Sequence, residues 1–312
     1  MADNTEYSIV IPVYNSEKTL HELYSRIIGV FSGISEKIEL VLVDDCSHDG
    51  SWSVMKDLRS QDRRVKIIHL ARNFGQHNAT FCGFHHCNGR YVIIMDDDLQ
   101  HPPEEIPVLI NKLSDGYLAV YGDYRVKCHS KIENFFSRMI ECIMHIVLNV
   151  PGTVYISSFA IFSSDVIKNA ISIRSAHVFL PAVISKSVPM NKVSSVKVVH
   201  EPRKVGSSNY SFIKYLKLSL NLIINYSALP LILVIAFGLL MSLLSIGYGT
   251  LIVANWLLNP GSGLMGWNSL ITAITFLNGA MLMSMGVIGE YVRRILAELT
   301  YEQPFLIGEI DV

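Results

Sequence analysis

The first hundred or so residues alternate between short apolar runs and segments in which apolar residues recur every three or four positions. The runs are five to seven residues long, and such runs are typical of strands buried on both faces of a sheet. The segments between them have the spacing of helices with one buried face. We expect strands at 7–13, 38–43, 65–70 and 91–95, and helices at 16–31, 51–58 and 76–87. This alternation predicts an α/β fold with a mostly parallel sheet and helices on both of its faces.

The last third of the chain has a different pattern. No Asp, Glu, Lys or Arg occurs between residues 218 and 289. This region contains two apolar stretches, at about 229–253 and 268–290, and each supplies the roughly 20 residues that a membrane-spanning helix needs. A short loop with Pro and Gly separates them. We expect a two-helix transmembrane hairpin over 228–292, and a buried helical hairpin in a soluble protein is the alternative.

The charges that flank this hairpin predict its orientation. Lys214 and Lys217 precede it, Arg293 and Arg294 follow it, and the loop between the two stretches has no cation. The positive-inside rule therefore places the N-terminal domain and both termini in the cytoplasm. No basic segment followed by an apolar run opens the chain, so no cleavable signal peptide is expected. These features predict a multi-pass membrane protein, with residues 293–312 as a cytoplasmic tail.

Composition and charge narrow the possible partners. Half of the 312 residues are hydrophobic and only 17% are charged, whereas soluble domains carry about a quarter. The formal net charge of −1 gives no reason to expect nucleic acid as a partner. Residues 1–124 contain 11 basic and 18 acidic side chains, and residues 125–217 contain 13 and 4. The acidic half suits a cation and the basic half suits an anion or an anionic membrane surface, with chance clustering on solvated faces as the alternative.

Polar and acidic residues follow the expected strands, at the edge of the sheet where ligands bind in such folds. These residues are Tyr14 and Asn15 after the first strand, Asp44 and Asp45 after the second, and Asp96, Asp97 and Asp98 after the fourth. Three consecutive aspartates repel one another, and a bound cation would compensate for this repulsion. Because carboxylate oxygens suit Mg²⁺ or Mn²⁺, which also bridge phosphates, we expect one of these ions here.

The three aspartates receive different expected roles. Alternate residues of an extended segment point to opposite sides, so Asp96 and Asp98 would share one side and Asp97 the other. We assign Asp98 as the direct metal ligand and Asp96 as a contact to the metal or to a phosphorylated ligand. Gln100 is a weaker candidate ligand, and Asp97 is the reserve candidate for a general base. A solvated acidic turn is the alternative interpretation.

Four segments resemble the motifs of glycosyltransferase family 2, and more narrowly of its polyprenyl-phosphate glycosyltransferase branch. They are IVIPVYN at 9–15, VDDCSHDG at 43–50, RNFG at 72–75 and MDDDLQHPPE at 95–104. An Asp-x-Asp motif alone is weak evidence, but four motifs in the right order are specific. The resemblance extends to RKVGSSNYS at 203–211 and GVIGEYVRR at 286–294, so it covers nearly the whole chain.

The resemblance implies a GT-A fold, with a catalytic domain over 1–209, and an enzyme that uses a divalent cation. It implies transfer of a sugar from a nucleotide sugar, by likeness a UDP-sugar, to undecaprenyl phosphate or another polyprenyl phosphate. The configuration at the anomeric carbon would invert, and the product would serve cell-envelope glycans. Asp44 would contact the base, and Arg125 and Arg203 would hold the lipid phosphate or the donor diphosphate. The residues implied for the nucleotide, diphosphate and metal are Pro12, Tyr14, Asn15, Asp44, Asp45, Asp96, Asp98, Gln100 and Ser208. Some relatives form tetramers, so a homo-oligomer is expected by resemblance.

Two segments would bring the lipid to this site. Residues 131–149 and 210–227 are expected to be amphipathic helices in the membrane interface, although a core-facing helix would share the pattern of the first. A polysaccharide synthase subunit and a non-catalytic nucleotide-binding membrane scaffold are the alternative functions. The identity of the sugar stays open, because Ser16, Ala160 and Asn209 differ from the residues that are common at these positions in the family that the chain resembles.

Overall fold

The computed structural model describes residues 5–124, 148, 150–173, 178–201, 229–258, 266–299 and 304–312. The chain forms two compact units. The first unit contains residues 1–211 and 301–312, and the second contains residues 212–300. A β-sheet forms the centre of the first unit, and the described part of the second unit is helical.

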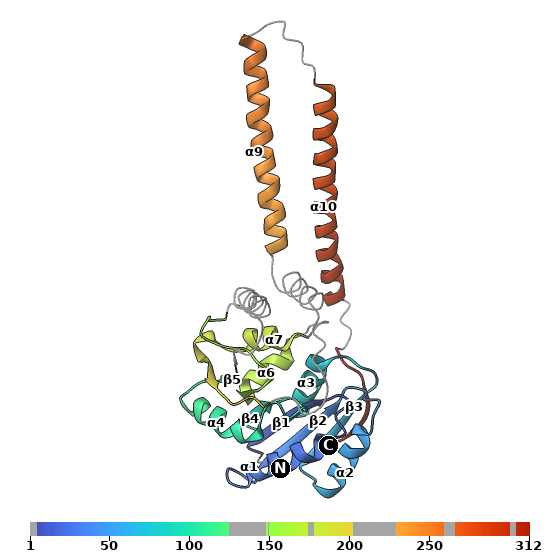
Figure 1. Ribbon diagram of the computed structural model, residues 1–312, viewed down its shortest axis with the longest axis vertical. Helices are drawn as coiled ribbons and strands as arrows, with labels where there is room; N and C mark the ends of the chain where they lie inside the picture. The colour runs from blue at the N-terminus through green and yellow to red at the C-terminus, as the bar shows by residue number, and fades with distance from the viewer. Residues whose placement is uncertain are drawn as a thin grey trace. The chain divides into compact units, whose positions relative to one another are not determined.

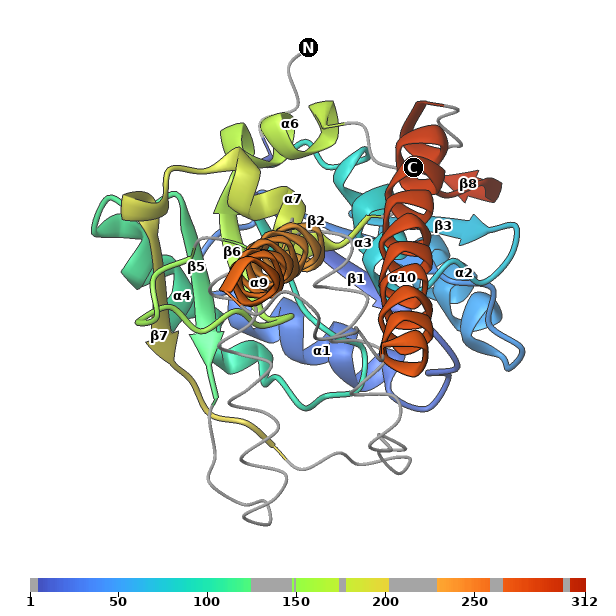
Figure 2. The same cartoon turned by 90° about the horizontal axis from the view of Figure 1, so that it is seen from above.

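The sheet of the first unit has eight strands. They are β1 (Tyr7–Val13), β2 (Ile38–Asp44), β3 (Val65–Leu70), β4 (Tyr91–Ile94), β5 (Ala119–Asp123), β6 (Ala160–Ser163), β7 (Val193–Lys197) and β8 (Ile307–Asp311). Their order is β7-β5-β6-β4-β1-β2-β3-β8, and Figure 2 shows β7 and β5 on the left and β3 and β8 on the right. The central strands β4, β1, β2 and β3 are parallel, as are β5 and β7. Only β6 and β8 run antiparallel to their neighbours, so the sheet is mostly parallel, as predicted.

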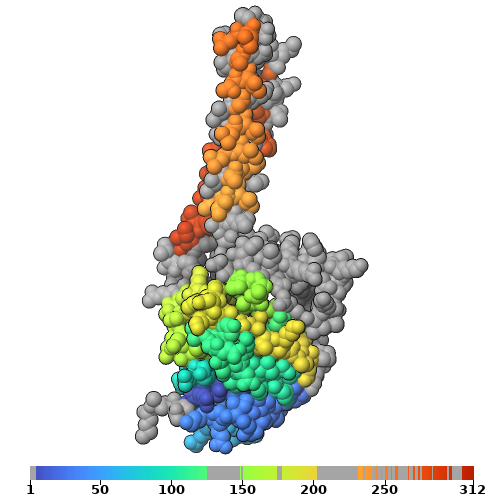
Figure 3. Space-filling model, turned by 90° about the vertical axis from the view of Figure 1, so that its left-hand side faces the viewer, coloured from blue at the N-terminus to red at the C-terminus, as the bar shows by residue number. Residues whose placement is uncertain are grey.

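Helices cover both faces of this sheet (Figures 1 and 2). One face packs against α1 (Leu20–Phe31), α2 (Ser51–Gln61) and α4 (Ile106–Ser114). The other carries α3 (Gln76–Phe84), α6 (Ser164–Ser172) and α7 (Leu180–Ser187). Short 3-10 helices span Pro103–Glu105 and Met190–Lys192. On the face in Figure 3, the green residues of α4 lie beside the yellow residues of β7, which α4 contacts.

Burial on both faces explains why the strands are continuously apolar. Every residue of β1 and β2 is buried. Ile9 and Ile11 of β1 belong to the core that α1 covers. Val10 faces α3, where Gly83 lets the helix approach so closely that an added Cβ would overlap the Val10 side chain. The central sheet is therefore a two-sided core of the kind that the sequence pattern predicts.

The predicted strands and helices agree with the structure except at several ends. Helix α1 begins at Leu20 and not at residue 16, because residues 16–19 form a turn closed by a Thr19 N–H to Ser16 C=O hydrogen bond of 3.0 Å. Helix α3 ends at Phe84, before the loop that leads to Gly89. The sequence analysis also did not anticipate β8. This strand pairs with β3, and the Glu309 and Asp311 side chains form ion pairs with Lys56 and Arg59 at 2.8 and 3.0 Å.

The second unit contains α9 (Leu229–Leu258) and α10 (Trp267–Leu299), which include the two apolar stretches. Many large apolar side chains on these helices are exposed, including Leu243 at 68% and Leu282 at 70%. Within the residues that the structure describes, no helix has the combination of length and apolarity needed to cross a membrane. The expected transmembrane hairpin is therefore not confirmed. The expected interfacial helices at 131–149 and 210–227 lie outside the described residues, apart from Leu148.

Candidate active site

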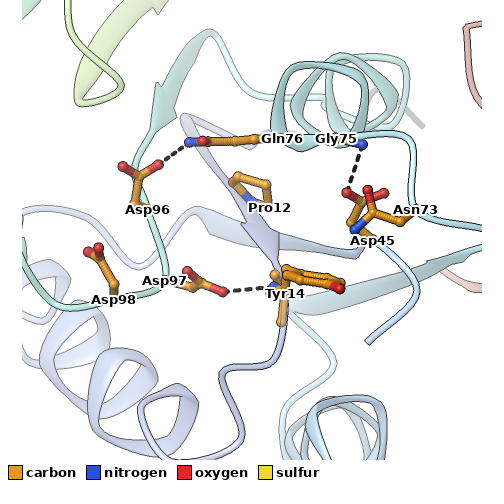
Figure 4. A pocket seen from close by; sticks show the side chains of 10 residues that line it. Pro12, Tyr14, Asp45, Asn73, Gly75, Gln76, Asp96, Asp97 and Asp98 are labelled. Atoms are coloured by element: carbon orange, nitrogen blue, oxygen red, sulfur yellow. Dashed lines mark hydrogen bonds between the residues drawn. The ribbon is translucent and has the colours of Figure 1, made fainter. Parts of the chain in front are cut away.

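A cavity of about 290 Å³ lies at the carboxyl ends of β1 to β4. Strand order reverses between β1 and β4, and such a switch point is where α/β sheets bind ligands. The described lining residues are Pro12, Val13, Tyr14, Asp45, Asn73, Gly75, Gln76, Asp96, Asp97 and Asp98. Figure 4 shows Asp96 and Asp98 on one side, Asp45 and Asn73 on the other, and Pro12 between them. Loops from four consecutive parallel strands thus meet around one cavity.

The loops around this cavity contain left-handed backbone at residues other than glycine. Among the described residues, positive φ values of this kind occur only at Asn15 (55°), Cys46 (59°) and Leu99 (61°). They follow β1, β2 and β4 respectively. Each such residue costs on the order of 1–3 kcal/mol, and surrounding contacts must hold it in place. At Asn15 the side-chain oxygen accepts the His48 N–H at 2.8 Å, which joins the first two loops.

Asp97 fixes the aspartate loop to the end of β1. Its Oδ2 accepts the Tyr14 N–H at 2.9 Å, and its carbonyl accepts the Thr19 hydroxyl at 2.7 Å. Burial raises the pKa of the Asp97 carboxyl to about 6. In Figure 4, Asp97 is directed toward Tyr14 and Asp96 toward Gln76. Asp96 and Asp97 therefore have different hydrogen-bond partners, while all three aspartates line the same cavity.

Asp96 and Asp98 have their own hydrogen-bond donors. The Asp96 carboxylate accepts the Gln76 side-chain amide and the Ser158 hydroxyl, the latter at 2.6 Å. Oδ1 of Asp98 accepts the Gln100 N–H at 3.1 Å. Gln100 thus contributes its backbone to the loop and is not among the cavity-lining residues. Asp96 and Asp98 both remain in a position to contact a ligand in the cavity.

The two aspartates after β2 differ in environment. Asp45 lines the cavity and accepts the Phe74 and Gly75 N–H groups at 2.7 and 2.8 Å. Burial raises the pKa of the Asp45 carboxyl, although these two N–H bonds oppose the rise. Asp44 is fully buried, and its Oδ2 lies 2.6 Å from Nδ1 of His69. Asp44 does not line the cavity, so its contact with the base stays a prediction, and Asp45 is the aspartate of this pair that a ligand would reach.

His101 lies directly behind the aspartate loop. It is 3% exposed and stacks on Phe159, and neither ring nitrogen has a hydrogen-bond partner among the described residues. Nδ1 is 3.8 Å from Oδ2 of Asp96, beyond hydrogen-bond distance. Burial lowers the pKa of the His101 imidazole to about 4. The ring is therefore neutral at physiological pH and supports the loop by packing.

The structure gathers most of the predicted site residues that it describes. Pro12, Tyr14, Asp45, Asp96, Asp97 and Asp98 line one cavity, whereas Asn15 is not among its described lining residues and joins the first two loops through His48. Arg125, Arg203 and Ser208 lie outside the described residues. The sequence analysis did not assign a role to Asn73, Gly75 or Gln76. They follow β3 as the other loops follow their strands, so the same rule about carboxyl ends identifies them.

The cavity fits a divalent cation that is shared with a ligand. Among the described residues, no three His, Cys, Asp or Glu side chains converge as a complete metal site. Mg²⁺ is usually bound by one or two carboxylates plus substrate phosphates, and hard oxygen ligands suit it and Mn²⁺. Asp98 and Asp96 supply such carboxylates at the cavity. These two residues could therefore hold the ion together with phosphate oxygens.

Known proteins resemble the chain in sequence and fold. The glycosyl transferase family 2 signature matches residues 8–170, more than half of the chain. The undecaprenyl-phosphate 4-deoxy-4-formamido-L-arabinose transferase of Shewanella sediminis is 32% identical over 309 residues, covering 97% of this chain and 93% of that protein. The uncharacterized glycosyltransferase YkcC of Bacillus subtilis is 34% identical over 302 residues, covering 96% and 92%.

Among solved structures, the fold is similar to glucosyl-3-phosphoglycerate synthase from Mycobacterium tuberculosis in complex with Mn²⁺ and UDP-glucose. The TM-score is 0.51 at 16% identity, covering 70% of this chain and 77% of that chain. This likeness agrees with a GT-A-like α/β fold. The family signature and the two long alignments show that this chain belongs to glycosyltransferase family 2.

Proposed function

We propose that this glycosyltransferase transfers a sugar from a UDP-sugar to undecaprenyl phosphate or another polyprenyl phosphate, in cell-envelope glycan modification. The observation that carries the proposal is the cavity at the β1/β4 switch point, which is lined from the ends of four parallel strands and contains four aspartates, one after β2 and three after β4. The acceptor is proposed from the relatives named for undecaprenyl phosphate, which align with nearly the whole chain.

The residues of the cavity suit a nucleotide diphosphate that arrives with a cation. The described lining residues include four aspartates and no basic side chain, so a bare diphosphate would be repelled. We propose that Asp98 and Asp96 hold Mg²⁺ or Mn²⁺ and that Gln100 supports Asp98 through its backbone. When bound, such an ion acts as a Lewis acid that offsets negative charge on the departing nucleotide. Tyr14, 45% exposed at the cavity, is proposed to contact the nucleoside.

The acceptor needs cations more than it needs a base. A phosphate monoester has its second pKa near 6, so the attacking oxygen is largely ionised at about pH 7. Arg125 and Arg203 are proposed to hold that phosphate through paired N–H bonds, which would offset the repulsion between two anionic substrates. Asp97 is already engaged by Tyr14 and Thr19, so its proposed part is to position the loop, with proton acceptance as a secondary possibility.

We also propose that residues 212–300 attach the enzyme to the bacterial inner membrane, with the first unit on its cytoplasmic side. Support comes from the charge-free sequence between 218 and 289 and from the exposed apolar side chains of α9 and α10. Extended exposed apolar surfaces mark membrane or protein contacts. Fractionation with a carbonate wash tests this proposal, and release of the protein into the soluble fraction would contradict it.

Transfer into lipid tests the proposed reaction. Purified full-length protein in detergent is incubated with undecaprenyl phosphate, Mn²⁺ and one radiolabelled UDP-sugar at a time, and label is counted in an organic extract. Label in the extract that requires undecaprenyl phosphate supports the proposal. Label in a water-soluble polymer would favour a polysaccharide synthase. Absence of transfer from every UDP- and GDP-sugar, with nucleotide binding retained, would favour a scaffold.

A further inference from the structure

The carboxylate of Asp96 is held from two directions by neutral side chains. Nε2 of Gln76 donates to Oδ1, and Oγ of Ser158 donates to Oδ2 at 2.6 Å. Gln76 is the first residue of α3, and Ser158 lies just before β6. Three separate segments therefore meet at one carboxylate, and each of its oxygens has a defined orientation. Figure 4 shows the bond between Gln76 and Asp96 across the cavity.

The position of Gln76 is itself set by the other side of the cavity. Asp45 accepts the N–H groups of Phe74 and Gly75, the two residues before Gln76. Residues 74–76 thus form a bridge, with Asp45 bound at one end and Asp96 at the other. The bridge turns at Gly75, where φ is +89°. Because Gln76 is exposed, burial does not account for its ordered side chain, and fixing such a side chain costs up to about 2 kcal/mol.

We propose that Gln76 and Ser158 are positioning residues, which fix the Asp96 carboxylate to receive the cation-bound diphosphate of the donor. The inference rests on the proposed function and adds two residues that the sequence motifs do not assign. A carboxylate accepts hydrogen bonds at about four lone-pair positions, so donors from two side chains set the orientation of Asp96 at the cavity that it lines. Removing hydrogen bonds that orient metal-binding groups typically weakens metal affinity about 10- to 100-fold.

Binding of UDP in the presence and absence of Mn²⁺ tests the proposal without relying on turnover. Full-length protein in detergent is titrated with UDP by calorimetry, at saturating Mn²⁺ and with chelator. Gln76→Met removes the amide donor with little change of size, and Ser158→Ala removes the hydroxyl. Each variant should bind UDP with Mn²⁺ at least about tenfold more weakly than the wild type. Each should also require more Mn²⁺ for half-maximal binding, while chelator-treated samples should differ little.

Matched variants separate positioning from general damage. Gln61→Met removes a glutamine that donates to Asp57 at 2.8 Å on the exposed surface of α2, and it should bind UDP like the wild type. Ser158→Thr retains a hydroxyl and should restore at least part of the Mn²⁺-dependent binding. Thermal unfolding shows whether each variant is folded. Gln76 is exposed, so Gln76→Met keeps the test valid should Ser158→Ala fail to fold.

The possible outcomes distinguish this inference from the proposed function. Wild-type protein that binds UDP with Mn²⁺, alongside Gln76→Met and Ser158→Ala variants that bind equally well, would overturn the positioning role alone. Equal weakening with and without Mn²⁺ would also overturn it, because the loss would then not involve the cation. Wild-type protein that binds neither UDP nor GDP with Mn²⁺ would overturn the proposed function and the inference with it.

Discussion

Replacing Gly75 by alanine is a sharp test of the bridge between Asp45 and Asp96. Gly75 has φ +89° and ψ 154°, a region that only glycine adopts readily. None of the described atoms beyond its chain neighbours lies within 4 Å of the position where a Cβ would stand. The added methyl group therefore meets no obstacle, and the effect of Gly75→Ala comes from backbone strain alone.

The structure offers a matched glycine away from the cavity. Gly116 lies between α4 and β5 and has φ +94°, and a Cβ added there would likewise meet none of the described atoms within 4 Å. Alanine at either position should cost about 1–3 kcal/mol in stability. For a unit of this size, about 1 kcal/mol corresponds to roughly 2–4 °C in Tm. Both variants should therefore melt about 4–8 °C below the wild type if the strain is near 2 kcal/mol.

Only Gly75→Ala should change nucleotide binding. Relaxation of the strain moves the backbone that presents Gln76 to Asp96, so we expect affinity for UDP with Mn²⁺ to fall about tenfold or more. Gly116→Ala, with similar loss of Tm, should bind UDP like the wild type. Differential scanning fluorimetry and calorimetric titration of the two variants measure both effects. Equal UDP affinity in the two variants would refute the reasoning. Strain at Gly75 would then affect UDP binding no more than strain at Gly116, so the bridge would not position Asp96.

Four further outcomes can be checked. Lys66→Met should destabilise the protein by about 3 kcal/mol, since it leaves the buried Glu39 without the cation 2.8 Å away. Adding Glu39→Gln to the same chain should recover part of that loss, and a double-mutant cycle followed by thermal unfolding measures the recovery. Cys46→Gly should stabilise the protein by about 0.5 kcal/mol, because glycine adopts the φ of +59° without strain. Asn15→Gly should give no such gain, since it loses the hydrogen bond to His48. Chemical unfolding of the two variants measures the difference. Asp98→Ala should abolish transfer into lipid while the circular dichroism spectrum stays unchanged, and full activity would remove its assignment as the metal ligand. Chelation should stop transfer and added Mn²⁺ should restore it, so activity that persists after exhaustive chelation would argue against a divalent ion.

Periodicity predicted the central fold because both faces of the sheet are buried. The strands 7–13 and 65–70 have the predicted bounds: every position of the first is buried, and in the second only Lys66 and His69 are partly exposed. The start of α1 was predicted four residues too early, because residues 16–19 contact neighbouring loops instead of continuing the helix. Strand β8 could not be read from periodicity. Four of its five residues are exposed, and its place depends on pairing with β3 more than 230 residues away in sequence.

The site could be predicted as far as local sequence determines it. Strand ends locate the aspartates, so Asp96, Asp97 and Asp98 were identified before their contacts were known. The partner of each carboxylate depends on tertiary structure, and no sequence spacing indicates that Ser158 meets Asp96 across 62 residues. Asp44 and Asp45 are adjacent and both buried, yet only Asp45 lines the cavity, because consecutive residues at a strand end point to opposite sides.

Two carboxylates at opposite ends of the sheet, the buried Glu39 and the partly exposed Asp96, have partners of different kinds. Near the amino ends, Glu39 receives its cation from the protein, through Lys66, and two further hydrogen bonds from Ser8 and Asn88 complete its shell. Such a pair is stable without any ligand. At the carboxyl ends, the donors that orient the Asp96 carboxylate through Gln76 and Ser158 are neutral.

Neutral donors fix the direction of a carboxylate without adding a charge of their own. Because Lys66 serves Glu39 inside the protein, substitutions near Lys66 should affect stability with little effect on UDP binding. Substitutions at Gln76 should do the reverse, since the bonds lost there serve a ligand and contribute little to the core.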